Sequence, residues 1–386
     1  MSRRVFRRNA LRRTTRTHWL IAVLLALAGL VAGEYPWLTS VRLRAYHILE
    51  KAIRRPSADI VVVLIGDEEY GGPRLQNRKP LHRDYLADLL TKIREGNPRA
   101  IAIDVDLSSP DAARPVIQPD YLKETNQFFD ALRNAASEDC PIFLSAAIRP
   151  DAKRNTYQRL ANIFDGTSLG DHVYTGYILL PADIRNIPPL VEISDGTTMR
   201  SIVARMAEVT QHHRVSIPTA EQVSFGVFRA PESFEQYAAG KVLEARVDDL
   251  KKWFAHQYVL IGGDWTADNV TGAHIDHHMT PAGDIAGVFV HANYLQSLIG
   301  GPIGALGELT RAAIELGTAL SFSILFVAAR GWWKLVFLLL VNLGLIVLTY
   351  LFLDVLGVFF EAVVPITLLG GHAIIETMLE KESHHA

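Results

Sequence analysis

The sequence is almost free of cysteine, on which disulfide-bonded domains and many structural zinc sites depend. Cys140 is the one cysteine among 386 residues. An internal disulfide and a zinc site built on paired cysteines are therefore excluded. The surrounding stretch DCPIFLSAAI is typical of a buried strand, which predicts that the thiol packs as a small core side chain.

Sequence patterns of common enzymes are also scarce. The chain has no glycine-rich phosphate loop with its lysine, so nucleotide chemistry of that kind is excluded. GTSLG at residues 166–170 matches the nucleophile elbow of serine hydrolases, but that motif needs a helix after it. The following HVYTGYILL is strand-like. We therefore expect that the chain is not an enzyme and uses no cofactor.

Acidic residues are missing from the first segment, SRRVFRRNALRRTTRTH, which carries seven arginines. An apolar run, WLIAVLLALAGLVAG, follows it, and arginines before such a run stay on the cytoplasmic side. We expect a cytoplasmic basic segment at residues 1–18 and a transmembrane helix at residues 19–37. Cleavage of this segment as an export signal is the alternative, because Ala26-Leu27-Ala28 fits a signal peptidase. Since membrane topology explains the arginines, we expect no binding of nucleic acid.

Long apolar runs are abundant near the other end of the chain. Each is close to the roughly 20 residues that cross a bilayer. Arg330 and Lys334 separate the first two runs and Asp354 follows the second, so positive charge places both termini in the cytoplasm. We expect three transmembrane helices within residues 310–374, a short cytoplasmic tail at residues 375–386 and a multi-pass protein of a bacterial inner membrane. The three runs are residues 312–329, 335–353 and 355–374.

Polar side chains inside these runs are candidates for signal coupling. An ionisable group at membrane depth is costly and is a functional candidate by default. Glu361 lies in the last run, Glu315 in the first of the three, and Asn342 in the run between them. We expect these residues to couple the membrane helices to an output. The alternative is that they hold helices or subunits together.

The exported region, residues 38–309, alternates between strand-like and helical patterns. DIVVVLIGD is rich in β-branched residues, LHRDYLADLLTKIREG has apolar residues at helical spacing, and RAIAIDVDL is strand-like again. Much later, YVLIGG precedes the helical VFVHANYLQSLIGG. This alternation predicts an α/β domain with a mainly parallel sheet flanked by helices. An α-helical transmembrane bundle completes the predicted fold.

Five stretches of the exported region, in their order and spacing, resemble a known sensory family. The chain is similar to the second type of CHASE domain, the cyclase- and histidine-kinase-associated extracellular sensor. One span before the domain and three after it are also similar to the topology of that family. The stretches are IVVVLIGD, KPLHRDYLADLL, RAIAIDVDLSSPD, DGTTMRS and the segment from YVLIGG through HIDHHMTP to GVFVHANYLQSLI.

The resemblance implies a sensory subunit that detects a ligand or protein partner outside the membrane. In the family an enzyme usually follows the last span, whereas ETMLEKESHHA is too short to hold an active site. We therefore expect an effector on a separate chain, and a homo-oligomer, a dimer or larger, in the lipid bilayer. The alternative is a structural or scaffold subunit of an envelope assembly.

Acidic residues that follow predicted strands mark a candidate ligand crevice. In an open α/β sheet, ligands favour the crevice beyond the carboxyl ends of the strands. Alternatively, Asp67 and Asp104 cap helices or bind loop amides. The candidates from strand ends and from the motifs of the resemblance are Asp67, Arg83, Asp104, Asp264, Asp276 and His291.

The stretch HIDHHMTP is rich in metal-ligand residue types. His274, His277 and His278 offer imidazoles, and Asp276 adds a carboxylate. However, Thr280-Pro281 and nearby glycines indicate a loop, in which spacing along the chain does not fix geometry. We expect a structural loop and no metal. Metal binding or pH sensing by the three histidines remains the alternative.

Overall fold

The chain divides into two compact units, one of Arg55–Ile303 and one of Met1–Arg54 with Gly304–Ala386. The helices and strands of the first unit form an α/β domain. The computed structural model describes residues 48, 59–108, 120–151, 153–154, 156–180, 186–187, 189–211, 224–225, 228–265, 276–280, 282–300, 303–305, 310, 313–314, 317, 333–356 and 358–359.

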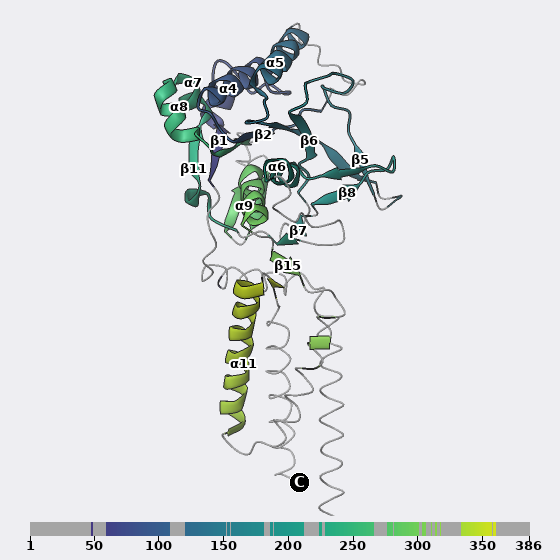
Figure 1. The fold of residues 1–386 in the computed structure, drawn as a ribbon, viewed down its shortest axis with the longest axis vertical. Coiled ribbons are helices and arrows are strands. Elements are labelled where there is room, and N and C mark those ends of the chain that lie inside the picture. Colours follow the sequence, from purple (N-terminus) through teal and green to yellow (C-terminus); the bar gives the residue numbers. More distant parts are fainter. Residues whose placement is uncertain are drawn as a thin grey trace, which may run out of the picture. The chain divides into compact units, whose positions relative to one another are not determined.

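A six-stranded sheet forms the centre of this domain (Figure 1). Its order is β11-β1-β12-β2-β3-β6, and each neighbouring pair is parallel. Parallel strands are buried on both faces, which explains the continuous β-branched run of the first strand. The prediction of an α/β domain with a mainly parallel sheet is confirmed. The strands are β1 Ile60–Gly66, β2 Ala100–Asp104, β3 Ile142–Ala146, β6 Val173–Tyr177, β11 Glu235–Ala238 and β12 Tyr258–Asp264.

One face of the sheet is covered by the helices that Figure 1 labels α4, α5, α7 and α8. Val61 and Val63 point to this face, and leucines at helical spacing along α4 pack against them. Cys140 is fully buried in the same cluster, and burial raises the pKa of its thiol to about 11, as expected for a core residue. The helices are α4 Arg83–Glu95, α5 Tyr121–Ala135, α7 Ala239–Glu244 and α8 Val247–Phe254, with the short α3 Asp67–Gly71 after β1.

The other face is covered by α6 Ile202–Thr210 and α9 Gly287–Ile299. Ser201 caps α6 by accepting a hydrogen bond from the amide of Ala204. Helix α9 lies close to the sheet, because a Cβ on Gly262 would be 2.5 Å from the Cβ of Val288. The two faces of β1 therefore belong to two separate hydrophobic clusters.

Short strand pairs extend the domain beyond the central sheet. The aspartate-glycine stretch at residues 195–196 turns between β8 and β9, and β13 pairs with β14 immediately before α9. The pairs are β4 Ile148–Asp151 with β5 Thr156–Arg159, β8 Leu190–Glu192 with β9 Thr198–Arg200, β13 His277–Thr280 with β14 Gly283–Ala286, and β7 Asn186–Ile187 with β10 Ser224–Phe225; the 3-10 helix η1 is Pro231–Ser233. Another short pair, β15 Ile303–Ala305 with β16 Val358–Phe359, is joined through residues 304–305 and 358–359, which belong to the second unit.

The second unit contains the long apolar helix α11, Trp333–Leu351, which runs into the π-helical turn η2, Phe352–Leu356. Within the described residues, the segment Val336–Val355 is the one that is long and apolar enough to cross a membrane. It corresponds to the predicted span at residues 335–353. The other predicted spans lie largely outside the described residues, so the bundle stays a prediction.

Candidate ligand site

Acidic residues gather at the carboxyl edge of the central sheet. The parallel register sets Gly262 of β12 opposite Asp104 of β2, and Gly66 of β1 opposite Asp264 of β12. Asp67 follows directly after β1 and begins α3. Three of the predicted ligand residues therefore lie at one edge, where open α/β sheets bind ligands.

A cavity of about 640 Å³ lies along this edge. Asp104, Asp106 and Asp276 contribute carboxylates to its wall. Ile148 and the aliphatic run at residues 178–180 line it as well. The cavity thus combines acids with a hydrocarbon surface, which is the usual character of a small-molecule site.

Asp104 is the most unusual residue of the cavity wall. Its side chain is 5% exposed, and Oδ2 accepts no hydrogen bond within the described part of the chain. His291 Nε2 lies 3.9 Å from Asp104 Oδ1 and donates to the carbonyl of Ile178. Burial raises the pKa of Asp104 to about 6; the charge of His291 lowers it, Asp276 raises it and His278 lowers it. A carboxyl group in such surroundings is a functional candidate.

Two stacked aromatic rings form another part of the wall. The rings of Tyr70 and Trp265 lie 4.6 Å apart at an angle of 16°. Gly263 permits this arrangement, since a Cβ there would be 2.1 Å from the indole ring. The indole Nε1 is buried and donates no hydrogen bond to a described residue. The wall therefore offers an unsatisfied donor as well as the unsatisfied acceptor of Asp104.

The histidine-rich stretch forms a hairpin beside the cavity. His277 Nε2 lies 2.8 Å from Asp264 Oδ1, and His278 Nε2 lies 2.8 Å from Asp276 Oδ1. The prediction of a loop is wrong for residues 277–280, which form β13, because pairing with β14 extends the backbone. His277 Nδ1 also lies 3.6 Å from Asp284 Oδ2, so this imidazole faces two carboxylates, whereas His278 faces that of Asp276. His274 lies outside the described residues.

Comparison with protein-family models decides which family this arrangement belongs to. The model of the CHASE2 domain matches residues 20–340, which is most of the chain. The chain belongs to the CHASE2 domain family. CHASE2 domains are extracellular sensory domains, so the resemblance seen in the sequence motifs is confirmed. None of the curated proteins and none of the solved structures matches the chain.

The six predicted ligand residues of this CHASE2 domain occupy different positions. Asp104 and Asp276 lie on the cavity wall, and Asp67 begins α3. His291 is buried behind Asp104, and Asp264 holds His277. Arg83 departs from the prediction, because it is 2% exposed and packs between α4 and α5, where its guanidinium lies 3.9 Å from the centre of the Tyr121 ring. The family resemblance pointed to Arg83 but did not indicate that its side chain is buried against α5.

A group of side chains that sequence analysis missed lies at the start of α4 in the CHASE2 domain. Ligand-type atoms of His82, Asp84 and Glu124 lie within 4.8 Å of one another. Arg78 already binds both carboxylate oxygens of Glu124, and the amide of Arg83 donates to the same carboxylate at 3.3 Å. Burial raises the pKa of Glu124, but the hydrogen bonds and charge of Arg78 hold it below its ordinary value. We interpret the group as a buried ion pair rather than a metal site.

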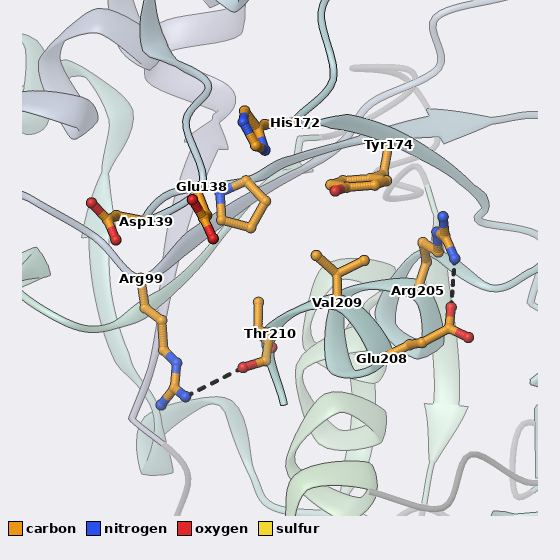
Figure 2. A pocket seen from close by; sticks show the side chains of 10 residues that line it. Arg99, Glu138, Asp139, His172, Tyr174, Arg205, Glu208, Val209 and Thr210 are labelled. Atoms are coloured by element: carbon orange, nitrogen blue, oxygen red, sulfur yellow. Dashed lines mark hydrogen bonds and ion pairs between the residues drawn. The ribbon is translucent and has the colours of Figure 1, made fainter. Parts of the chain in front are cut away.

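A second cavity, of about 620 Å³, lies at the amino edge of the sheet (Figure 2). Arg99, Pro141 and His172 line it, and each directly precedes a strand of the sheet. Figure 2 shows Arg99 reaching the carbonyl of Thr210, whereas Arg205 binds Glu208 at 2.6 Å on the same helix. Arg205 and Glu208 are therefore paired with each other, whereas Arg99 is held by a backbone carbonyl. Sequence analysis missed it because the crevice rule points only to the carboxyl edge.

Proposed function

We propose that the chain is a sensory subunit of a bacterial inner membrane, whose exported CHASE2 domain binds a small ligand in the cavity at the carboxyl edge of the sheet. The membrane helices pass the bound state to an effector on a separate chain, and the CHASE2 domain itself performs no catalytic step. The main support for the proposal is that the carboxylate of Asp104 is buried and that its Oδ2 has no hydrogen-bond partner among the described residues.

An unsatisfied buried acceptor gives the ligand a means of changing the domain. A polar group that is buried without a partner costs about 1–3 kcal/mol. A ligand that donates to Asp104 removes this cost only in the conformation where the cavity is closed around it. Such differential affinity shifts the population towards that conformation. Asp276 supports this role, because its carbonyl accepts from the amide of Gly287 at 2.7 Å, which joins the cavity wall to the start of α9.

The membrane part of the proposal rests on α11 and its polar residue. Asn342 lies within the segment that is able to cross a membrane, and its Oδ1 is buried with no hydrogen bond from a described residue. In a bilayer such an oxygen is a natural partner for a polar group of a neighbouring helix. Glu315 and Glu361 are the proposed groups, and both lie outside the described residues.

Purification of the tagged full-length chain from its native membrane in mild detergent tests this function. We expect a cytoplasmic effector, such as a kinase or cyclase, to be retained at a fixed ratio to the sensor, together with a second copy of the chain. Quantitative mass spectrometry of the purified complex measures both ratios. A tagged membrane protein with an unrelated exported domain, purified in the same way, is the control.

Two results of that purification would count against the proposal. Recovery of the chain alone would remove the effector from it. Recovery of a set of envelope proteins without a signalling enzyme would favour a structural scaffold instead.

A further inference from the structure

The cavity at the carboxyl edge is lined by a buried carboxylate and by aliphatic side chains, and these two features limit the chemical class of its ligand. Asp104 supplies a carboxylate oxygen that has no described partner. Ile148 and the aliphatic residues 178–180 form one wall of the same cavity. His291 Nε2 lies 3.9 Å from the other oxygen of Asp104, beyond hydrogen-bond distance, and donates to the carbonyl of Ile178. The group that best complements the buried carboxylate is therefore a cation with hydrogen-bond donors.

The protein's own cations on the wall do not meet this need. The guanidinium of Arg78 is held by the carboxylate of Glu124, and this pair is 9% exposed on each side. Lys79 is the other cation among the lining residues, and it makes no hydrogen bond to Asp104 Oδ2. Asp106 binds the amide and hydroxyl of Ser108 through Oδ1, and Asp276 binds His278. Asp104 is thus the acid whose oxygen awaits a donor.

We propose that this cavity binds an organic monocation, with an ammonium or amidinium head on Asp104 and an aliphatic or aromatic body against Ile148, residues 178–180 and the stacked rings of Tyr70 and Trp265. The inference rests on the proposed function, since it assigns a chemical class to the ligand of the same cavity.

A cation on Asp104 competes with a proton for the same oxygen. The titratable groups that face Asp104 are His291 from α9, and Asp276 and His278 from the hairpin beside the cavity. The pKa of Asp104 is about 6 in the free protein, so the carboxylate is mostly charged at neutral pH. Binding of a cation should therefore weaken by about tenfold for each pH unit below the pKa, because only the charged form is competent.

Three matched probes test the class of ligand: 4-phenylbutylamine, 4-phenylbutanol and 4-phenylbutyrate. Each has a phenyl ring on a four-carbon chain, and the head groups are positive, neutral and negative respectively. Calorimetric titration of the full-length chain in lipid nanodiscs is expected to give the tightest binding for the amine. At about pH 5 the amine should bind about tenfold more weakly than near neutral pH. Asp104→Asn should abolish the preference for the amine over the alcohol while retaining the circular dichroism spectrum of the wild type.

Lys79→Met is the discriminating variant. It removes a like charge from the wall, so we expect it to bind the amine more tightly than the wild type does. Tighter binding of the butyrate probe, with loss of that binding in Lys79→Met, would overturn the inference in favour of an anion. Equal binding of the amine to the wild type and Asp104→Asn, or no binding of the amine at all, would overturn it as well. None of these outcomes affects retention of an effector, so the proposed function fails or stands separately.

Discussion

Arg78→Met is expected to lower the free energy of unfolding of the CHASE2 domain by about 3–5 kcal/mol. The reason is the carboxylate of Glu124, which is 9% exposed and would remain in the interior without its counter-charge. The remaining donors, the amide of Arg83 and the ring of His82, are at 3.3 Å and 3.2 Å and replace only part of the lost interaction. Urea titration of the full-length chain, followed by tryptophan fluorescence, measures the change.

A matched control shows whether the expected loss of stability comes from the burial of the ion pair or from ion pairing alone. Arg133 forms an equally direct pair with Asp130 at 2.8 Å, but the two side chains are 42% and 70% exposed. Arg133→Met should therefore change the free energy of unfolding by no more than about 1 kcal/mol. The double replacement Arg78→Met with Glu124→Met should recover part of the loss, because no single charge stays buried. Equal losses for Arg78→Met and Arg133→Met would contradict this account.

Asp104→Asn is expected to stabilise the domain at alkaline pH. The pKa of Asp104 is about 6 in the folded chain against an ordinary value of 3.8, so the folded state binds the proton more tightly than the unfolded state does. Stability from this group is fully present below about pH 4 and is lost as the pH rises through about 6. Asn carries no charge, so the variant should exceed the wild type by roughly 1–3 kcal/mol at about pH 8.

The pH dependence of this difference is the sharper test of Asp104. Near pH 4 the wild-type carboxyl is protonated and resembles the amide, so the advantage of Asp104→Asn should nearly disappear. Asp106→Asn is the control, since Asp106 lies on the same wall and is exposed. The measurement is the free energy of unfolding of the wild type and of both variants between about pH 4 and about pH 8. A variant that is less stable than the wild type at alkaline pH would mean that the charged carboxylate makes net favourable contacts, chiefly with His291.

Local patterns were sufficient to predict most strands of the central sheet, whereas the edge strand β11 was not predicted. The β-branched run of β1 and the helical spacing of α4 are each determined by nearby residues. Because the strands run parallel, the carboxyl ends of β1, β2 and β12 lie at one edge. Asp104 was therefore predictable as a residue of the crevice. That its oxygen would lack a partner was not, because this depends on how α9 packs His291 behind it.

Features that depend on distant segments were beyond sequence reasoning. Arg78 and Glu124 lie 46 residues apart, and no local pattern connects them. The direction of Arg83 depends on α5, whose Tyr121 and Thr125 contact its guanidinium. The histidine-rich stretch was predicted as a loop because only its pairing with β14 makes it a strand. In each case a tertiary contact overrides the local signal.

We propose that the ligand binds at the carboxyl edge of the sheet. Hydrogen exchange of the full-length chain, with and without the tightest-binding phenylbutyl probe, tests it most directly. We expect slower exchange at residues 104–106, at Ser108 and at residues 178–180, which line that cavity. Protection confined to Arg99, residues 138–141 and residues 205–210 would place the ligand in the cavity at the amino edge and contradict the account.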